Sequence, residues 1–95
     1  MKSIMPNGNE KVCYQCGTPF NLHIHHIFKG PNRKLADEDG CWVYLCFTHH
    51  TGDEGVHTSK YKWLDDQLKM KAQAAWEERY GSREDFRKRY GKSYL

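Results

Sequence analysis

The chain has 95 residues, of which 38% are hydrophobic and 28% charged, and its formal net charge is +3. A chain of this length forms one small domain whose apolar core alone gives marginal stability, so we expect an additional stabilising element such as a bound metal. No stretch approaches the roughly 20 apolar residues that span a bilayer, so composition excludes an integral membrane protein and predicts a soluble one.

The N-terminal half predicts two short strands joined by irregular segments. Residues 1–10 are polar and predict a flexible start. In residues 21–28 apolar side chains alternate with histidines, which favours a strand, and residues 29–33 read as a turn or loop. Residues 35–40 form an acidic connection ending in glycine, and residues 42–45 predict a second, β-rich strand.

The C-terminal half predicts two helices. After a brief helical turn from His49, the longer helix begins beyond Thr58 or Ser59, either of which can cap it, and ends at Gly81. Ser82 opens a second helix, with Asp85 at the capping-box position. Apolar residues share one face of the longer helix: Tyr61, Leu64, Leu68, Ala72, Ala75, Trp76 and Tyr80.

Two pairs of metal-capable side chains have two residues between their members. They are Cys13 with Cys16 and, separated from them by 29 residues, Cys46 with His49. This spacing lets each pair hold one edge of a tetrahedron, and thiolate and imidazole suit zinc. We therefore predict a structural Zn²⁺ site. Cys41 has no partner at ligand spacing and is expected to be a buried apolar thiol.

The alternative for four cysteines is a disulfide framework. The polar N-terminus contains no apolar run typical of an export signal, so we expect a reducing compartment, the cytoplasm, where disulfides are rare. Cysteines two residues apart on one turn are also poorly placed to pair across a core.

Five further histidines surround the predicted zinc pairs. His23, His25 and His26 lie in the first predicted strand, and His50 and His57 follow the second pair. A single histidine is ordinarily solvated or buried in a core, but this clustering around a metal scaffold favours a functional site.

The sequence His25-His26-Ile27, followed by Leu45-Cys46-x2-His49-His50 and then His57, resembles the HNH endonucleases, which are zinc-braced ββα-metal finger nucleases. The resemblance covers residues 13–57 and, loosely, the lysine-rich tail, and it is to small phage-encoded members. It implies an α+β fold: a small ββα-metal finger stabilised by structural zinc, with a C-terminal helical extension. Residues 1–95 would form a single nuclease domain, with a core at 11–57 and helices at 58–95.

The resemblance further implies hydrolysis of phosphodiester bonds in DNA, in the host cytoplasm if the protein is phage encoded. His26 would be the general base, and His25, His50 and His57 would bind a second divalent metal such as Mg²⁺, Mn²⁺, Ni²⁺ or Zn²⁺. His23 shares the strand face of His25 and is an alternative ligand. Two features depart from the family: Cys41 stands where the family has Asn, and six residues separate His50 from His57 instead of three.

Basic residues near the proposed base and in the tail are candidate DNA contacts. Residues 1–57 carry five Lys/Arg against six Asp/Glu (net −1), whereas residues 58–95 carry ten against six (net +4). A solvated surface accounts for these charges equally well. The candidates are Lys29, Arg33, Lys34, Arg83, Arg87, Lys88 and Arg89.

Two other functions remain open from the sequence. The first is a non-catalytic zinc-binding module that binds nucleic acid or protein. The second is a regulatory phage protein that binds a partner through its long helix. A pure zinc module holds one tight metal ion per chain, whereas the nuclease requires a second, exchangeable site.

Overall fold

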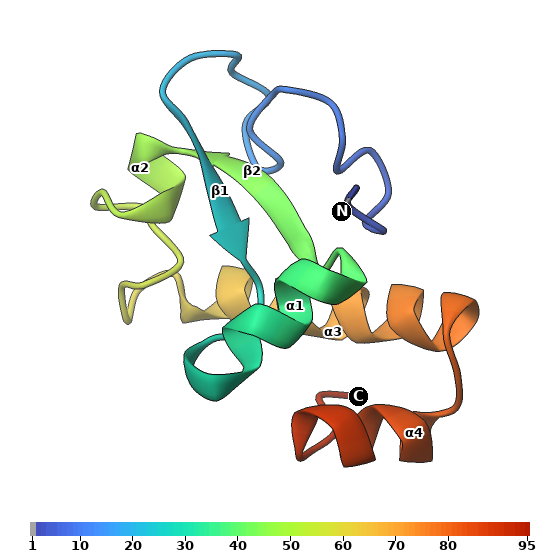
Figure 1. The fold of residues 1–95 in the computed structure, drawn as a ribbon. Coiled ribbons are helices and arrows are strands. Elements are labelled where there is room, and N and C mark those ends of the chain that lie inside the picture. Colours follow the sequence, from blue (N-terminus) through green and yellow to red (C-terminus); the bar gives the residue numbers. More distant parts are fainter. Residues whose placement is uncertain (1) are drawn as a thin grey trace.

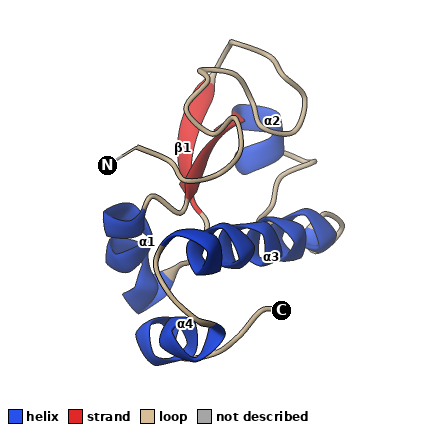
Figure 2. Cartoon of the chain, turned by 90° about the vertical axis from the view of Figure 1, so that its right-hand side faces the viewer, coloured by secondary structure: helices blue, strands red, loops and turns tan. Residues whose placement is uncertain are grey.

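The computed structural model describes residues 2–95 and has a small α+β fold (Figure 1). Two strands form one antiparallel sheet; in Figure 1 one short helix lies beside the strands, and the longer helices lie below them. In Figure 2 the longest helix, α3, lies between the sheet and α4. The elements, in chain order, are β1 (Leu22–His26), η1 (Gly30–Asn32), α1 (Arg33–Asp39), β2 (Trp42–Cys46), α2 (Phe47–His50), α3 (Lys62–Arg79) and α4 (Arg83–Tyr90). Within residues 2–95, no helix has the length and apolar character required to cross a membrane.

Both predicted strands form, and their pairing fixes the direction of the histidines. His25 lies opposite Val43 and His26 lies opposite Trp42. Because side chains alternate along a strand, His23 and His25 share one face and His26 belongs to the other. The first strand is shorter than predicted: Ile27 and Phe28 lie beyond it and are fully buried in the core.

The acidic connection expected at residues 35–40 is instead helix α1, so that part of the prediction is wrong. The helix begins at Arg33, buries Ala36 and Asp39, and ends at Gly40 in the left-handed conformation, with φ of 79°. A Cβ on Gly40 would also lie 2.3 Å from the Lys2 carbonyl oxygen, so glycine is required here twice over.

The N-terminal segment, expected to be a flexible start, packs against the connection between α1 and β2. Met1 lies outside the described residues. The Ser3 hydroxyl donates to the Trp42 carbonyl at 2.6 Å, and the Ile4 amide donates to the Gly40 carbonyl at 2.9 Å. Met5 is buried in the core.

Helix α3 buries the face formed by Leu64, Leu68, Ala72 and Trp76, as the apolar spacing predicts. Tyr80, which was expected on the same face, lies just beyond the helix and is exposed, so that part of the prediction is wrong. The predicted caps are wrong. The helix begins at Lys62 without a side-chain cap, and the Thr58 hydroxyl donates instead to the Gly55 carbonyl. The capping box of Ser82 and Asp85 at the start of α4 is confirmed.

One buried carboxylate joins the three longer helices. Asp39, at the end of α1, accepts hydrogen bonds from Trp76 Nε1 of α3 at 2.9 Å and from the Tyr90 hydroxyl of α4 at 2.7 Å. The Arg89 guanidinium of α4 donates to both Asp39 oxygens, at 2.6 and 2.9 Å. The Tyr80 hydroxyl donates to the Asp39 carbonyl. Polar contacts through Asp39 therefore hold α1, α3 and α4 together beneath the sheet.

Candidate metal centres

A tight turn of the backbone holds Cys13 and Cys16 close to each other. Gly17 adopts φ of 80°, and its amide donates to the Cys13 carbonyl at 2.8 Å, which closes the turn that carries Cys13 and Cys16. The second pair needs no special turn. Cys46 ends β2 and His49 lies on α2, which begins at the next residue.

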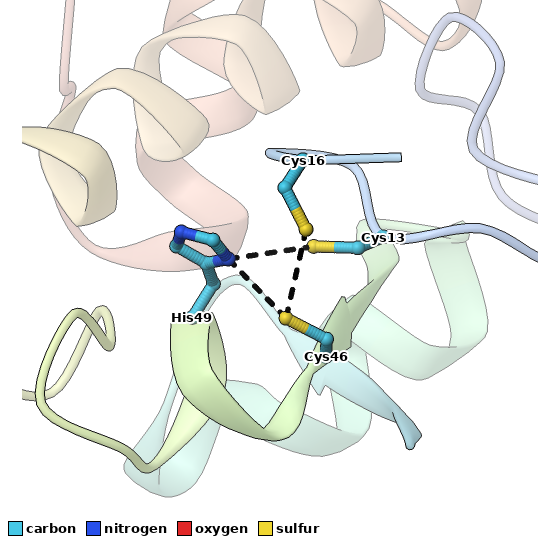
Figure 3. A group of neighbouring side chains, drawn as sticks. All are labelled: Cys13, Cys16, Cys46 and His49. Atoms are coloured by element: carbon cyan, nitrogen blue, oxygen red, sulfur yellow. Dashed lines mark hydrogen bonds between the residues drawn. The ribbon is translucent and has the colours of Figure 1, made fainter. Parts of the chain in front are cut away.

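The four predicted zinc ligands converge (Figure 3). One donor atom from each of Cys13, Cys16, Cys46 and His49 lies within 4.8 Å of all the others. Cys16 Sγ is 3.8 Å from Cys46 Sγ. His49 Nδ1 is 3.2 Å from Cys46 Sγ and 3.9 Å from Cys13 Sγ.

These separations fit a tetrahedral zinc site. With Zn–S bonds of about 2.3 Å, two sulfurs of a regular tetrahedron are about 3.8 Å apart, and a sulfur and an imidazole nitrogen are about 3.6 Å apart. All four cysteines of the chain are free thiols in the structure. The cluster of Cys13, Cys16, Cys46 and His49, called the Cys3His site below, can therefore bind a metal ion such as zinc.

The pKa values of two thiols of this site are shifted in opposite directions: that of Cys13 is lowered, whereas burial raises that of Cys46. Burial acts to raise the pKa of Cys13, but hydrogen bonds from the backbone of Cys46, Cys16 and Gln15 outweigh it and leave the pKa below its ordinary value. A thiolate is the form that binds metal. The second ring nitrogen of His49, Nε2, lies 3.5 Å from the Glu54 carboxylate, an arrangement that favours Nδ1 as the metal-facing atom.

A second group, the His trio, consists of His25 on β1, His50 on α2 and His57 in the following loop. One ring nitrogen of each lies within 4.8 Å of the others. The ring centroids of His50 are 5.2 Å from those of both His25 and His57. His25 is 2% exposed, and within residues 2–95 its Nε2 has no hydrogen-bond partner. A buried polar atom without a partner requires an explanation, and a cation between the three rings would supply one.

The rings of the His trio are neutral at physiological pH. Burial lowers the pKa of His25 to about 3 and that of His50 to about 4, and the neighbouring histidines and Lys29 add to both effects. Burial and Lys29 also lower the pKa of His57. Neutral imidazole is the form that binds a cation.

Two glycines return His57 to the other two histidines despite the long separation in sequence. A Cβ on Gly55 would lie 2.6 Å from the His50 carbonyl oxygen, and a Cβ on Gly52 would lie 2.9 Å from Thr48 Cα. The Val56 amide donates to the His49 carbonyl at 3.0 Å. The loop therefore folds back tightly on α2, which is how six intervening residues are accommodated.

Two neighbouring side chains, His23 and Lys29, contact the Nδ1 atoms of His50 and His57. His23 Nδ1 is 2.9 Å from His50 Nδ1, so His23 contacts the group without belonging to it. Lys29 Nζ is 3.0 Å from His57 Nδ1 and 3.6 Å from the buried Asp65 carboxylate. With Nδ1 of His50 engaged by His23, Nε2 is the nitrogen that His50 retains for a ligand. The Lys29 ammonium can only donate, so Nδ1 of His57 accepts and the proton of the neutral His57 ring lies on Nε2. A cation bound by His57 Nε2 therefore requires the contact between Lys29 and His57 to break.

His26 stands beside the His trio but points to a different partner. Its Nε2 lies 3.5 Å from Asp37 on α1, a residue the sequence did not single out because α1 itself was not predicted. His26 borders two adjoining clefts, of about 270 and 390 Å³. The first is lined by Ile24, His25, His26, Lys29, Gly30, Arg33, His50 and His57. The second is lined by His26, Gly30, Pro31, Arg33, Lys34 and Asp37.

The predicted DNA contacts divide into two groups. Lys29, Arg33 and Lys34 line the clefts beside His26. In the tail, Arg83 pairs with Glu77 and Arg87 pairs with Glu84. Arg89 pairs with Asp39, at the end of α1. Lys88 is exposed on α4. The tail arginines are thus partly neutralised within the chain, whereas the loop cations surround the histidines.

Cys41 is buried as predicted and belongs to neither group. Burial raises the pKa of its thiol to about 12, so it remains protonated. Its carbonyl accepts a hydrogen bond from the Ile27 amide at 3.0 Å, directly after His26. The backbone of this residue therefore braces the end of β1, a task that needs no particular side chain.

Comparison with protein-family models, curated proteins and solved structures gives no match to this chain.

Proposed function

We propose that this chain is a metal-dependent DNA endonuclease of the HNH type, which hydrolyses phosphodiester bonds. The observation that supports this most strongly is the His trio, with its unpartnered buried Nε2 of His25, next to His26 in one basic cleft. The strands β1 and β2 pair with each other, although η1 and α1 lie between them in the chain, and the short helix α2 follows β2 directly. Two paired strands followed by a short helix are the arrangement of a ββα-metal finger, which we propose as the finer description of the fold.

In this proposal the Cys3His site holds a structural Zn²⁺. The donor set contains no open position, because four protein ligands complete a tetrahedron. It joins the N-terminal loop to β2 and α2, the segments that carry His50 and lead to His57. Its task is to fix these elements rather than to react.

His26 acts as the general base. The carboxylate of Asp37 near Nε2 favours the tautomer with its proton on Nε2, which leaves the lone pair on Nδ1 to take a proton from water. The His26 side chain is 20% exposed, so water reaches it. The imidazolium formed by this transfer is stabilised by the same carboxylate.

The other cleft residues bind and orient the phosphate. Arg33 and Lys34 are exposed cations in the wall of the clefts and would contact the DNA backbone. His25, His50 and His57 would hold a divalent cation, which when bound stabilises negative charge on the scissile phosphate and the leaving 3′ oxygen.

The test is a nicking time course on supercoiled plasmid with Mg²⁺, Mn²⁺, Ni²⁺ or Zn²⁺. His26→Ala should lower the rate by roughly 10²–10⁴-fold without releasing metal. His50→Ala and His57→Ala should weaken metal binding, so a higher metal concentration should partly restore cleavage. Lys11→Ala, at an exposed lysine outside both clefts and outside the predicted DNA contacts, is the matched control and should cut at nearly the parental rate. A parental rate from His26→Ala would refute the assignment of the base.

The second candidate is a non-catalytic zinc module that binds nucleic acid or protein. The contact between Lys29 and His57 Nδ1 favours it, because an ammonium beside the trio opposes binding of a second cation. Metal analysis separates the two functions. One tight ion per chain and no cleavage with any of the four metals would establish the zinc module.

A further inference from the structure

His23 contacts His50, a member of the His trio, at hydrogen-bond distance. Its Nδ1 lies 2.9 Å from Nδ1 of His50, and the ring centroids are 5.1 Å apart at 72°. The His23 ring also makes a T-shaped contact with Phe47, with centroids 6.4 Å apart at 89°. His23 is half-buried, and both neighbouring rings limit its movement.

Two ring nitrogens at hydrogen-bond distance must share one proton. Either His23 donates and His50 accepts, or His50 donates and His23 accepts. In the first arrangement the proton of neutral His50 is on Nε2, and no lone pair is left there for a cation. In the second, the proton is on Nδ1 and the Nε2 lone pair is free.

We propose that His23 is a positioning residue that accepts the Nδ1 proton of His50 and so fixes His50 with its Nε2 lone pair directed to the metal. This inference rests on the second divalent site of the proposed function. It gives His23 a role distinct from that of a ligand, consistent with its position outside the His trio. The acceptor also makes the His50 imidazole a better electron donor.

The binding experiment uses the full chain with one equivalent of Zn²⁺ at the Cys3His site and follows Co²⁺ binding by its visible absorption. His23→Phe keeps a ring against Phe47 but removes the acceptor, and should raise the Co²⁺ dissociation constant by roughly 10–100-fold. His23→Gln offers an amide oxygen as an acceptor and should restore most of the affinity. Phe47→Leu changes the packing around His23 without removing the hydrogen bond, and should bind Co²⁺ almost as the parent does.

A second readout reports the proton directly. With Zn²⁺ at both sites, long-range ¹H–¹⁵N spectra of the parent should show His50 protonated at Nδ1 and metal-bound at Nε2. A His50 ring protonated at Nε2 would overturn the inference even if His23→Phe does not fold.

The outcomes also separate this inference from the proposed function. A parent that binds no Co²⁺ beyond the Cys3His site removes both. A parent that binds a second ion, together with a His23→Phe variant of equal affinity, removes only the role of His23.

Discussion

Replacement of Asp39 by alanine should destabilise the fold far more than replacement of its neighbour Glu38. Asp39 is 8% exposed and accepts from Trp76 Nε1 and from the Tyr90 hydroxyl, groups on side chains that are themselves 5% and 3% exposed. Glu38 is an exposed residue whose carboxylate pairs with the Arg89 guanidinium at 3.2 Å.

The magnitude follows from the donors that would be left unpaired. A buried donor without a partner costs about 1–3 kcal/mol. We assign about 2 kcal/mol to Trp76 and about 1 kcal/mol to Tyr90, whose hydroxyl also has Cys41 Sγ at 3.8 Å as a weak acceptor. Arg89 adds little, because its side chain is 34% exposed and its charge can return to water. Asp39→Ala should therefore cost about 3 kcal/mol, and Glu38→Ala about 0–1 kcal/mol.

The assay is thermal unfolding followed by circular dichroism, with zinc in excess so that metal release does not limit the transition. A loss of about 3 kcal/mol corresponds to a decrease in Tm of roughly 12–24 °C for a domain of this size. Glu38→Ala is the matched control, since it removes a carboxylate from the same helix and the same arginine. Equal Tm values for the two variants would refute the reasoning, because burial of the network would then contribute nothing.

Three further predictions concern the metal centres. Removal of zinc by a chelator, or Cys16→Ser, should abolish cooperative unfolding. Structural zinc contributes about 10–16 kcal/mol in small zinc domains, whereas the total stability of a domain is about 5–15 kcal/mol. A chelated chain that melts like the parent would contradict this prediction. Gly55→Ala should lower the free energy of unfolding by about 1–3 kcal/mol and weaken Co²⁺ binding at the His trio. The added Cβ would lie 2.6 Å from the His50 carbonyl oxygen, so the loop must move away from α2. Unchanged melting and Co²⁺ titration curves would count against that contact. Lys29→Met should tighten Co²⁺ binding at the same trio by roughly tenfold, equivalent to about 1.4 kcal/mol, because the ammonium that opposes the cation is removed; weaker binding in the titration would show that Lys29 supports the site instead.

The sequence was sufficient where a feature depends on neighbours along the chain. The two residues between Cys13 and Cys16, and between Cys46 and His49, identified the Cys3His site because such spacing orients both side chains of a pair together. The buried face of α3 follows from 3.6-residue periodicity. The box of Ser82 and Asp85 was predictable because both partners lie within one helical turn.

Tertiary structure alone decided α1 and the packed N-terminus. Residues 33–39 show no apolar periodicity, and the helix is held by Asp39 through partners 37 to 51 residues further along the chain. Ser3 likewise finds its acceptor 39 residues away, on Trp42. Contacts at such separations leave no pattern in a local window of sequence, so a polar segment reads as a loop.

The same limit applies to the histidines. Strand alternation put His23 and His25 on one face of β1. It could not predict that His25 forms the His trio with His50 and His57, while His23 only makes a contact to His50. That choice depends on where α2 ends and on how tightly the loop through Gly52 and Gly55 folds back on it. Residue types and spacing thus determined that the chain carries metal-capable side chains, whereas the distances between strand, helix and loop determined which of those side chains come together.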